Sequence, residues 1–254
     1  MPFSLTLVSP EPAAALEAAS RARAEVEAAG GAVKAERQLG PGAADLLVEG
    51  VALPRLRLAA AHAIAGLPAD ACAQAAAGRR KRLLVADMDS TIISCECLDE
   101  LADYAGRKAE VAAVTERAMA GELAFAPALR ERVATLAGLP IETVARCLDE
   151  RVRLNPGARL LVRTMAARGA RTVLVSGGFE SFARPVAAQA GFAAVRANRL
   201  LDDGACLTGR VGEPVLGREA KLEVLQGEAG ALDLHLEDTL AVGDGANDLA
   251  MIGA

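Results

Sequence analysis

The stretch Arg82-Leu83-Leu84-Val85-Ala86-Asp87-Met88-Asp89-Ser90-Thr91 contains the features that decide the fold of this chain. Residues 83–86 form a short continuous apolar run, which is typical of a strand buried on both faces of a parallel sheet. Asp87 follows directly, where such a strand ends, and Asp89 lies two residues further on. Ligands bind beyond the carboxyl ends of the strands in open α/β sheets, so this position predicts a functional site.

The two neighbouring carboxylates point to chemistry on a charged substrate. Anions this close repel, so we expect them to bind a cation or to keep one carboxyl protonated. Asp87 could then attack phosphorus as a nucleophile, while Asp89 protonates the leaving alcohol and later activates water. A lone Asp-x-Asp is more often a strand end with two solvated carboxylates. The hydroxyls of Ser90 and Thr91 favour the catalytic interpretation, because they add donors for an oxyanion.

The composition limits the class of protein. The 254 residues are 52% apolar and only 2% aromatic, so a core must be built mainly from Ala, Leu and Val. A net charge of −5 gives no field that would attract nucleic acid. No apolar run is long enough to cross a membrane, and no basic and apolar leader begins the sequence, so a cytoplasmic protein is predicted. Five scattered cysteines and two histidines argue against a disulfide framework and a histidine-based site.

The first 75 residues predict a small α+β domain. Strands are expected at residues 3–8, 33–38 and 45–51, and helices at residues 12–29 and 53–67. This order resembles the small amino-acid-binding regulatory domains that are often attached to metabolic enzymes. Residues 71–80 are expected to form a helical or irregular linker instead of a last strand. A serine-binding feedback module and a docking or homodimerisation module are both consistent with the pattern.

Residues 76–254 predict a second, larger domain of the α/β class. A helical block at about 98–153 follows the first aspartate motif directly, which is the position of an inserted cap that excludes water and reads the substrate. Asn155-Pro156-Gly157 is expected to begin the next helix, with Asn155 as its cap. Alternating helices and strands then continue to residue 242. This alternation predicts a doubly wound parallel sheet.

Three further motifs complete the predicted site. Two of them follow the carboxyl ends of predicted strands, and the third, with Lys221, lies at the start of a predicted helix. Ser176-Gly177-Gly178 offers a hydroxyl and close backbone approach, which suits a phosphate. Lys221 would add a mobile positive charge. Gly243-Asp244-Gly245-Ala246-Asn247-Asp248 predicts a Mg²⁺ site, with Asp244 as a direct ligand and with Asn247 and Asp248 orienting the ligands or Lys221.

These four motifs in this order resemble the phosphoserine phosphatases, a family of the haloacid dehalogenase superfamily with a Rossmann-like core. The resemblance extends to Glu96 and to residues 118–125, 129–133 and 197–200. It implies that Asp87 is phosphorylated and that Asp89 is the acid and base. It further implies that Mg²⁺ is held by Asp87, the backbone carbonyl of Asp89, and Asp244.

The resemblance also implies how the substrate is bound. The phosphoryl group would contact Ser176, the Gly177 backbone and Lys221. The serine part would be bound by Glu96 at its ammonium group and by Arg132 at its carboxylate, with Met119 and Phe125 as apolar walls. A zwitterion needs an anion and a planar fork of donors placed apart, which agrees with this assignment.

The implied activity is hydrolysis of O-phospho-L-serine to L-serine and phosphate, the last step of serine biosynthesis. Another small phosphomonoester as substrate, or transfer of the phosphoryl group to an alcohol such as homoserine, remains an alternative. A non-enzymatic phosphoryl acceptor is disfavoured by Asp89 and by the helical insertion. Members of the family continue beyond the last motif with a further strand and helix, whereas this sequence stops at Ala254. We therefore expect some apolar sheet surface to be uncovered.

Overall fold

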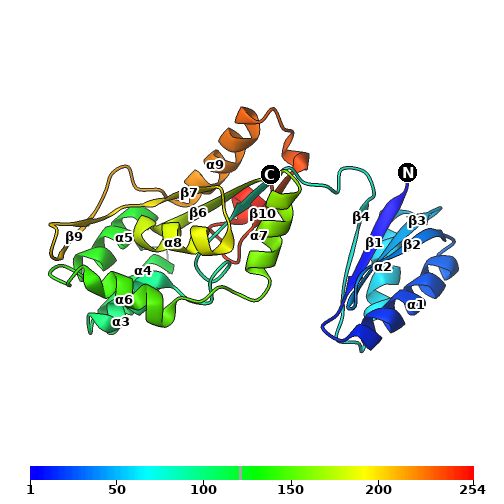
Figure 1. Cartoon of the computed structure of the whole chain (residues 1–254), viewed down its shortest axis with the longest axis horizontal. Coiled ribbons are helices and arrows are strands. Elements are labelled where there is room, and N and C mark those ends of the chain that lie inside the picture. Colours follow the sequence, from blue (N-terminus) through cyan, green and yellow to red (C-terminus); the bar gives the residue numbers. More distant parts are fainter. Residues whose placement is uncertain (120–121) are drawn as a thin grey trace. The chain divides into compact units, whose positions relative to one another are not determined.

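The computed structural model describes residues 1–119 and 122–254, apart from the side chains of residues 119 and 218. The chain forms two compact units, residues 1–80 and residues 81–254 (Figure 1). In the described part of the chain, no helix combines the length and the apolar character that crossing a membrane requires.

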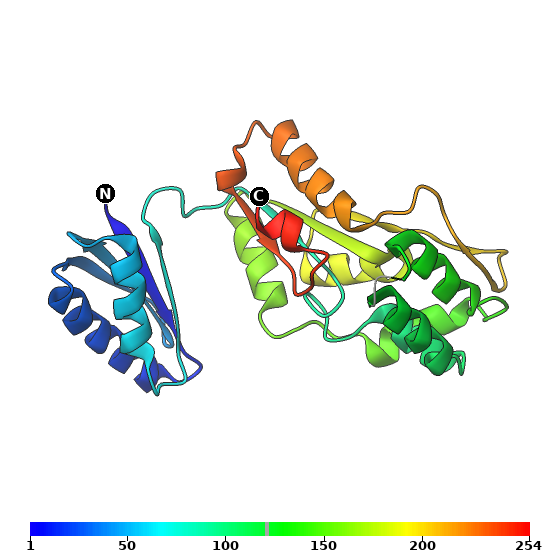
Figure 2. The same ribbon diagram turned by 180° about the vertical axis from the view of Figure 1, so that it is seen from behind.

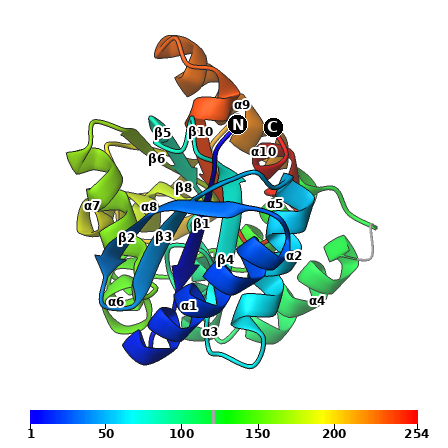
Figure 3. The ribbon, with the colours of Figure 1, turned by 90° about the vertical axis from the view of Figure 1, so that its right-hand side faces the viewer.

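The N-terminal unit is an antiparallel sheet covered on one face by two helices. Its elements are β1 (Phe3–Val8), α1 (Pro12–Ala28), β2 (Ala32–Gly40), β3 (Ala43–Glu49), α2 (Leu53–Ile64) and β4 (Asp70–Ala75). The strand order is β2-β3-β1-β4. Figure 3 shows α1 and α2 packed together against this sheet. Their small residues allow close approach, and Leu5, Leu46 and Val48 fill the space between the layers.

The expectation of a linker over residues 71–80 is wrong for its first half. Asp70–Ala75 forms β4, which pairs antiparallel with β1, and Leu5 lies opposite Ala73. Alanine, cysteine and glutamine have weak strand preference, so the local sequence gave little indication of this strand. Pairing with β1 and burial of Ala73 at 8% exposure override that preference.

The helix-free face of the same sheet has a polar centre. Asp45 accepts hydrogen bonds from Ser4 Oγ at 2.6 Å and from Thr6 Oγ1 at 2.7 Å. Arg79 donates to both carboxylate oxygens of Asp45, at 2.7 and 3.1 Å. Burial alone would raise the pKa of Asp45, but the Arg79 guanidinium and the two hydroxyls outweigh it and hold the pKa below its usual value. The end of the N-terminal unit is therefore fixed to its own sheet.

The second unit is built on a parallel sheet with the order β10-β5-β6-β7. These strands are β5 (Leu83–Ala86), β6 (Arg171–Phe179), β7 (Ala194–Asn198) and β10 (Thr239–Val242). Leu84 and Ala86 pack on the side of α7 (Ala158–Ala167) and α8 (Glu180–Ala190). Leu83 and Val85 pack on the opposite side, which contains α9 (Arg218–Ala231) and α10 (Leu249–Ile252) (Figure 2). Helices cover both faces, which confirms the predicted doubly wound sheet.

The predicted cap is present between β5 and α7. It consists of α3 (Cys97–Tyr104), α4 (Lys108–Met119), α5 (Phe125–Ala134) and α6 (Glu142–Arg151). The cap is joined to the hairpin of β8 (Leu200–Asp202) and β9 (Leu207–Val211) by backbone hydrogen bonds. Leu207 donates to the carbonyl of Leu139 at 2.8 Å, and Gly138 donates to the carbonyl of Leu207 at 2.9 Å. The cap is thus held against one end of the core.

The prediction that Asn155 caps a helix is wrong. The helix α7 begins at Ala158, after Gly157 in a left-handed conformation with φ of 87°. The Asn155 side chain instead donates to the carbonyls of Thr91 at 2.8 Å and Ile93 at 3.1 Å. It therefore supports the loop that follows β5, a long-range contact that local helix signals do not encode.

The edge of the sheet formed by β10 is partly exposed. All four residues of β10 are half-buried. Leu249 and Ile252 of α10 are 66% and 49% exposed, while Met251 of the same helix is buried. The short 3₁₀ helix Leu236–Asp238 precedes β10.

Candidate active site

Asp87 and Asp89 lie beyond the carboxyl end of β5 and face the same side. The chain stays extended past Ala86, and the Asp87 N–H donates to the carbonyl of Val242 on β10 at 2.9 Å. Met88, between the aspartates, is fully buried in the core. Side chains alternate along an extended chain, so burial of Met88 turns both carboxylates away from the core and toward the site.

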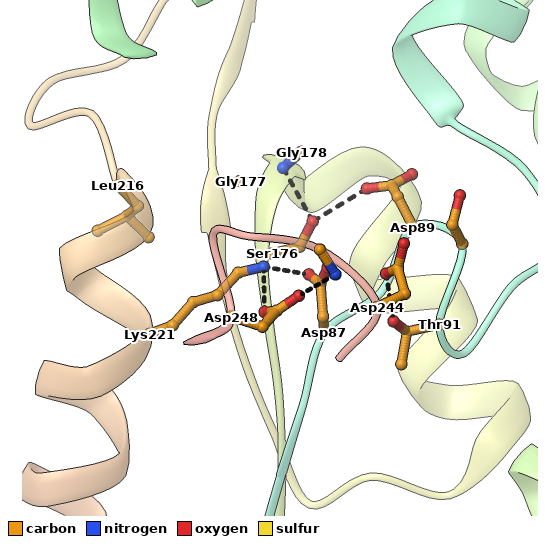
Figure 4. A network of polar contacts seen from close by, with 12 residues as sticks. Asp87, Asp89, Thr91, Ser176, Gly177, Gly178, Leu216, Lys221, Asp244 and Asp248 are labelled. Atoms are coloured by element: carbon orange, nitrogen blue, oxygen red, sulfur yellow. Dashed lines mark hydrogen bonds and ion pairs between the residues drawn. The ribbon is translucent and has the colours of Figure 1, made fainter. Parts of the chain in front are cut away.

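Lys221 joins two buried carboxylates (Figure 4). Its Nζ lies 2.9 Å from Asp87 Oδ1 and 2.7 Å from Asp248 Oδ1. The Lys221 and Asp248 side chains are 2% and 0% exposed, and Asp248 Oδ2 also accepts from the Gly245 N–H at 3.1 Å. Burial raises the pKa of Asp87 to about 7, although Lys221 opposes the shift. Lys221 therefore lowers the free energy of the ionised Asp87, the form that can attack phosphorus.

Asp89 is enclosed by hydrogen-bond donors. Its Oδ1 accepts from the Cys97 N–H at 2.9 Å, and its Oδ2 accepts from Ser176 Oγ at 3.2 Å. Burial raises the pKa of Asp89, and the contacts with Cys97 and Ser176 only partly oppose this. A carboxyl with a raised pKa can hold a proton and release it to a leaving group, which suits an acid and base.

The glycines after Ser176 allow close approach in the site. The strand β6 continues through Gly177 and Gly178 to Phe179 before α8 begins, so these residues are extended and do not begin a helix. A Cβ on Gly177 would lie 2.9 Å from Phe125 Cζ, and one on Gly178 would lie 2.9 Å from Asp89 Oδ2. Larger residues would therefore push the cap or the acid out of place.

One group of carboxylates could hold a metal ion. Asp87, Asp244 and Asp248 each offer an oxygen atom, and these atoms all lie within 4.8 Å of one another. They come from the ends of two neighbouring strands, and carboxylate oxygens are the ligands that Mg²⁺ prefers. The Asp89 side chain is not a member of this group, and the expected ligand from this residue, its backbone carbonyl, stays a prediction. Asp248 is already engaged by Lys221.

A cavity of about 180 Å³ adjoins the two aspartates and contains residues of both the core and the cap. Its lining is Asp87, Asp89, Glu96, Leu98, Phe125, Leu129, Arg132, Gly177, Gly178, Phe179, Asp244 and Asn247. Burial lowers the pKa of Arg132, but an arginine remains charged at neutral pH. The cavity therefore offers a cation from α5 and an anion, Glu96, just before α3. The Met119 side chain, expected as a wall, lies outside the described residues.

The Ser90 and Thr91 hydroxyls, which were expected as donors for an oxyanion, each donate to a carboxylate of the site in this structure. Ser90 Oγ donates to Glu96 Oε1 at 2.6 Å, and Thr91 Oγ1 donates to Asp244 Oδ1 at 2.6 Å. Ser90 has a φ of 53°, a backbone conformation that is uncommon for residues other than glycine. The tight turn therefore brings the Thr91 hydroxyl to Asp244, which is distant in sequence. It brings the Ser90 hydroxyl to Glu96, on the far side of the same loop.

Comparison with known proteins agrees with this geometry. Residues 84–252 match the haloacid dehalogenase-like hydrolases. A phosphoserine phosphatase of Mycobacterium tuberculosis is 46% identical over 178 residues, which cover 70% of this chain and 43% of that protein. A phosphoserine phosphatase of a Polaromonas species is 44% identical over 177 residues, covering 68% of this chain and 75% of that protein. A solved structure of the phospho-aspartyl intermediate analogue of phosphoserine phosphatase is 41% identical, with a TM-score of 0.62, and covers 68% of this chain and 82% of that one.

The chain belongs to the haloacid dehalogenase-like hydrolases, since the match extends along the core from β5 to α10. Within these hydrolases its relatives are phosphoserine phosphatases, which confirms the resemblance seen in the motifs. The chain spans less than half the length of the Mycobacterium relative and three quarters of the Polaromonas relative.

Replacing Lys221 by methionine should destabilise the second unit strongly. The change leaves Asp87 and Asp248 buried without their common cation, a loss of about 3–5 kcal/mol of unfolding free energy for a broken buried pair. Urea unfolding at neutral pH measures this. Lys108→Met, at an exposed position of α4 in the same unit, is the matched control, and Asp248→Asn combined with Lys221→Met should recover part of the loss. Equal stability of Lys221→Met and Lys108→Met would contradict the role of the ion pair.

Proposed function

We propose that this chain hydrolyses O-phospho-L-serine to L-serine and phosphate, the last step of serine biosynthesis, through a phosphorylated Asp87. The observation that supports this substrate most is that Glu96 and Arg132 line the same cavity as Asp87 and Asp89. A carboxylate and a guanidinium match the ammonium and carboxylate groups of a phosphorylated amino acid. Phe125, in the same cavity, would contact its carbon atoms.

The proposed reaction uses the two aspartates in turn. Asp87 attacks phosphorus and forms a phosphoryl bond as the bond to the seryl oxygen breaks, and Asp89 gives its proton to that oxygen. Asp89 then takes a proton from water, and the water oxygen attacks phosphorus and releases Asp87. Ser176, the Gly177 backbone and Lys221 would contact the phosphoryl oxygens and stabilise their charge during both steps.

Mg²⁺ is the proposed metal, and Asp87, Asp244 and the backbone carbonyl of Asp89 would hold it. A bound cation supplies charge neutralisation between the nucleophile and the phosphoryl group. Thr91 would orient Asp244, since its hydroxyl lies 2.6 Å from Asp244 Oδ1. Asn247 lines the cavity on the same loop as Asp244 and would orient the substrate or the metal ligands.

Replacing Asp87 by asparagine should abolish both turnover and phosphorylation of the protein. An amide does not attack phosphorus, so released phosphate should fall to the uncatalysed rate and no hydroxylamine-labile phosphoryl group should form. Phosphate release from O-phospho-L-serine and mass spectrometry of the quenched protein measure the two effects. The wild type with excess chelator serves as a second comparison and should also be inactive, with recovery on adding Mg²⁺. Turnover of the Asp87→Asn variant at the wild-type rate would refute the mechanism.

Replacing Arg132 by alanine should impair recognition of the substrate carboxylate. We expect kcat/KM for O-phospho-L-serine to fall by roughly 100-fold, as for loss of a charge-assisted contact of about 2–3 kcal/mol. Phosphoethanolamine has no carboxylate, so its kcat/KM should change little. Arg130→Ala is the control, because Arg130 lies on the same helix but pairs with Glu213 on the surface. Equal losses of kcat/KM with both substrates would contradict the assignment of Arg132 to the substrate carboxylate.

The alternative activity, transfer of the phosphoryl group to an alcohol, is tested by adding homoserine to the reaction. Mass spectrometry would detect phosphorylated homoserine if transfer occurs, whereas hydrolysis gives only free phosphate.

For the N-terminal unit we propose that L-serine binds it as a feedback ligand and that it pairs with a second copy of the chain. The presence of β4 supports the ligand-binding part of this proposal, because it completes the order of elements that resembles small amino-acid-binding regulatory domains. Inhibition by L-serine should weaken when residues 1–80 are removed, whereas inhibition by phosphate should not. Equal inhibition by serine with and without this unit would leave only product inhibition. A cytoplasmic location remains a prediction from the sequence.

A further inference from the structure

Asn198, at the end of β7, connects two segments of the site without lining its cavity. The residue is 2% exposed. Its Nδ2 donates to the carbonyls of Gly177 at 2.8 Å and Leu216 at 3.1 Å, and its Oδ1 accepts from the Leu216 N–H at 2.7 Å. The backbone N–H of Leu216 can only donate, so the atom of the Asn198 side-chain amide that it contacts must be the oxygen. The two donors of the amide are therefore directed at the two carbonyls.

The contact with Gly177 holds a peptide that also contacts Ser176. The Gly177 carbonyl and the Gly178 N–H belong to one planar peptide group. Asn198 holds the carbonyl end. The N–H end donates to Ser176 Oγ at 2.8 Å, a contact that Figure 4 shows. Because Ser176 Oγ accepts this bond, its own hydrogen is free to point to Asp89 Oδ2 at 3.2 Å. The orientation of the Ser176 hydroxyl thus depends on the orientation of the peptide that Asn198 holds.

The contact with Leu216 holds the segment that leads to Lys221. Leu216 is followed by Gly217, and α9 begins at the next residue, so Lys221 lies in the first turns of the helix. Gly177 and Leu216 lie 21 and 18 residues from Asn198 in the sequence. One buried amide therefore ties the segment with Ser176 and Gly177 to the segment that carries Lys221, and all three residues are proposed to bind the phosphoryl group.

We propose that Asn198 is a positioning residue for phosphoryl transfer. It orients the Gly177–Gly178 peptide and, through this peptide, the Ser176 hydroxyl. It also fixes the position of this peptide relative to the start of α9. The inference rests on the proposed use of Ser176, Gly177 and Lys221 as phosphoryl-binding groups. It does not depend on whether phosphoserine is the substrate. Residues that orient binding groups from behind typically change affinity or activity by about 10–100-fold when they are replaced.

The test compares Asn198→Ala and Asn198→Asp with the wild type in the full chain with Mg²⁺. Inhibition by orthovanadate, an analogue of the phosphoryl group in transfer, is measured with p-nitrophenyl phosphate and with O-phospho-L-serine as substrates. An inhibition constant does not depend on the fraction of folded protein, so it separates positioning from loss of structure. We expect the constant to rise, and kcat/KM to fall, about 10–100-fold in both variants. The ratio of kcat/KM for phosphoserine over phosphoethanolamine should stay unchanged, because Glu96 and Arg132 are untouched.

Asn198→Asp keeps the shape and the acceptor for the Leu216 N–H, but it loses the NH₂ group that donates to the carbonyls of Gly177 and Leu216. Thr172→Val is the control for lost stability: Thr172 is buried on β6, its Oγ1 accepts from the Ala193 N–H at 3.0 Å, and it lies at the far end of the strand. It should lower thermal stability with unchanged kinetics. Unchanged vanadate inhibition in both Asn198 variants would overturn the inference. Wild-type turnover of p-nitrophenyl phosphate without turnover of phosphoserine would refute the proposed substrate alone.

Discussion

The site depends on a single buried cation. Lys221 lies between Asp87 and Asp248, and all three side chains are almost completely removed from water. Burying two carboxylates costs several kcal/mol each unless an opposite charge and hydrogen bonds compensate them. Lys221 supplies the charge, and the Gly245 N–H supplies a further donor to Asp248. This ion pair links α9, the end of β5 and the loop after β10, so the position of Asp87 and the packing of three distant segments are set together.

Hydroxyl and amide side chains around this ion pair fix the rest of the site. Thr91 contacts Asp244, Ser90 contacts Glu96, and Ser176 contacts Asp89. Asn155 and Asn198 in turn hold backbone carbonyls of the segments that carry these hydroxyls. Asp89 and Asp244 therefore each accept from a neutral hydroxyl of a distant segment, and Glu96 accepts from a hydroxyl of its own loop. Such donors limit the rotation of a carboxylate without neutralising it, which leaves its charge for a metal ion or a substrate.

The core and the cap contribute different properties to the cavity. The core supplies the aspartates and the glycine-bearing end of β6, which suit phosphoryl chemistry on many substrates. The cap supplies Phe125 and Arg132 on α5, and Glu96 lies where the chain enters the cap. Because the ring of Phe125 lies against Gly177, the residues proposed to select the substrate and those proposed to bind its phosphoryl group lie in one small volume. A change of cap residues could alter specificity while the chemistry stays the same.

The sequence determined the parallel sheet, the inserted helical cap and the candidate residues Asp87, Asp89, Ser176, Lys221 and Asp244, because apolar runs that end in charged or glycine-rich loops are local patterns. It did not predict β4, whose residues have weak strand preference, or the contacts of Ser90, Asn155 and Asn198. Those depend on partners far along the chain or on one unusual backbone angle. Tertiary structure decided these features, since a hydrogen bond forms only where folding brings a donor and an acceptor within about 3 Å.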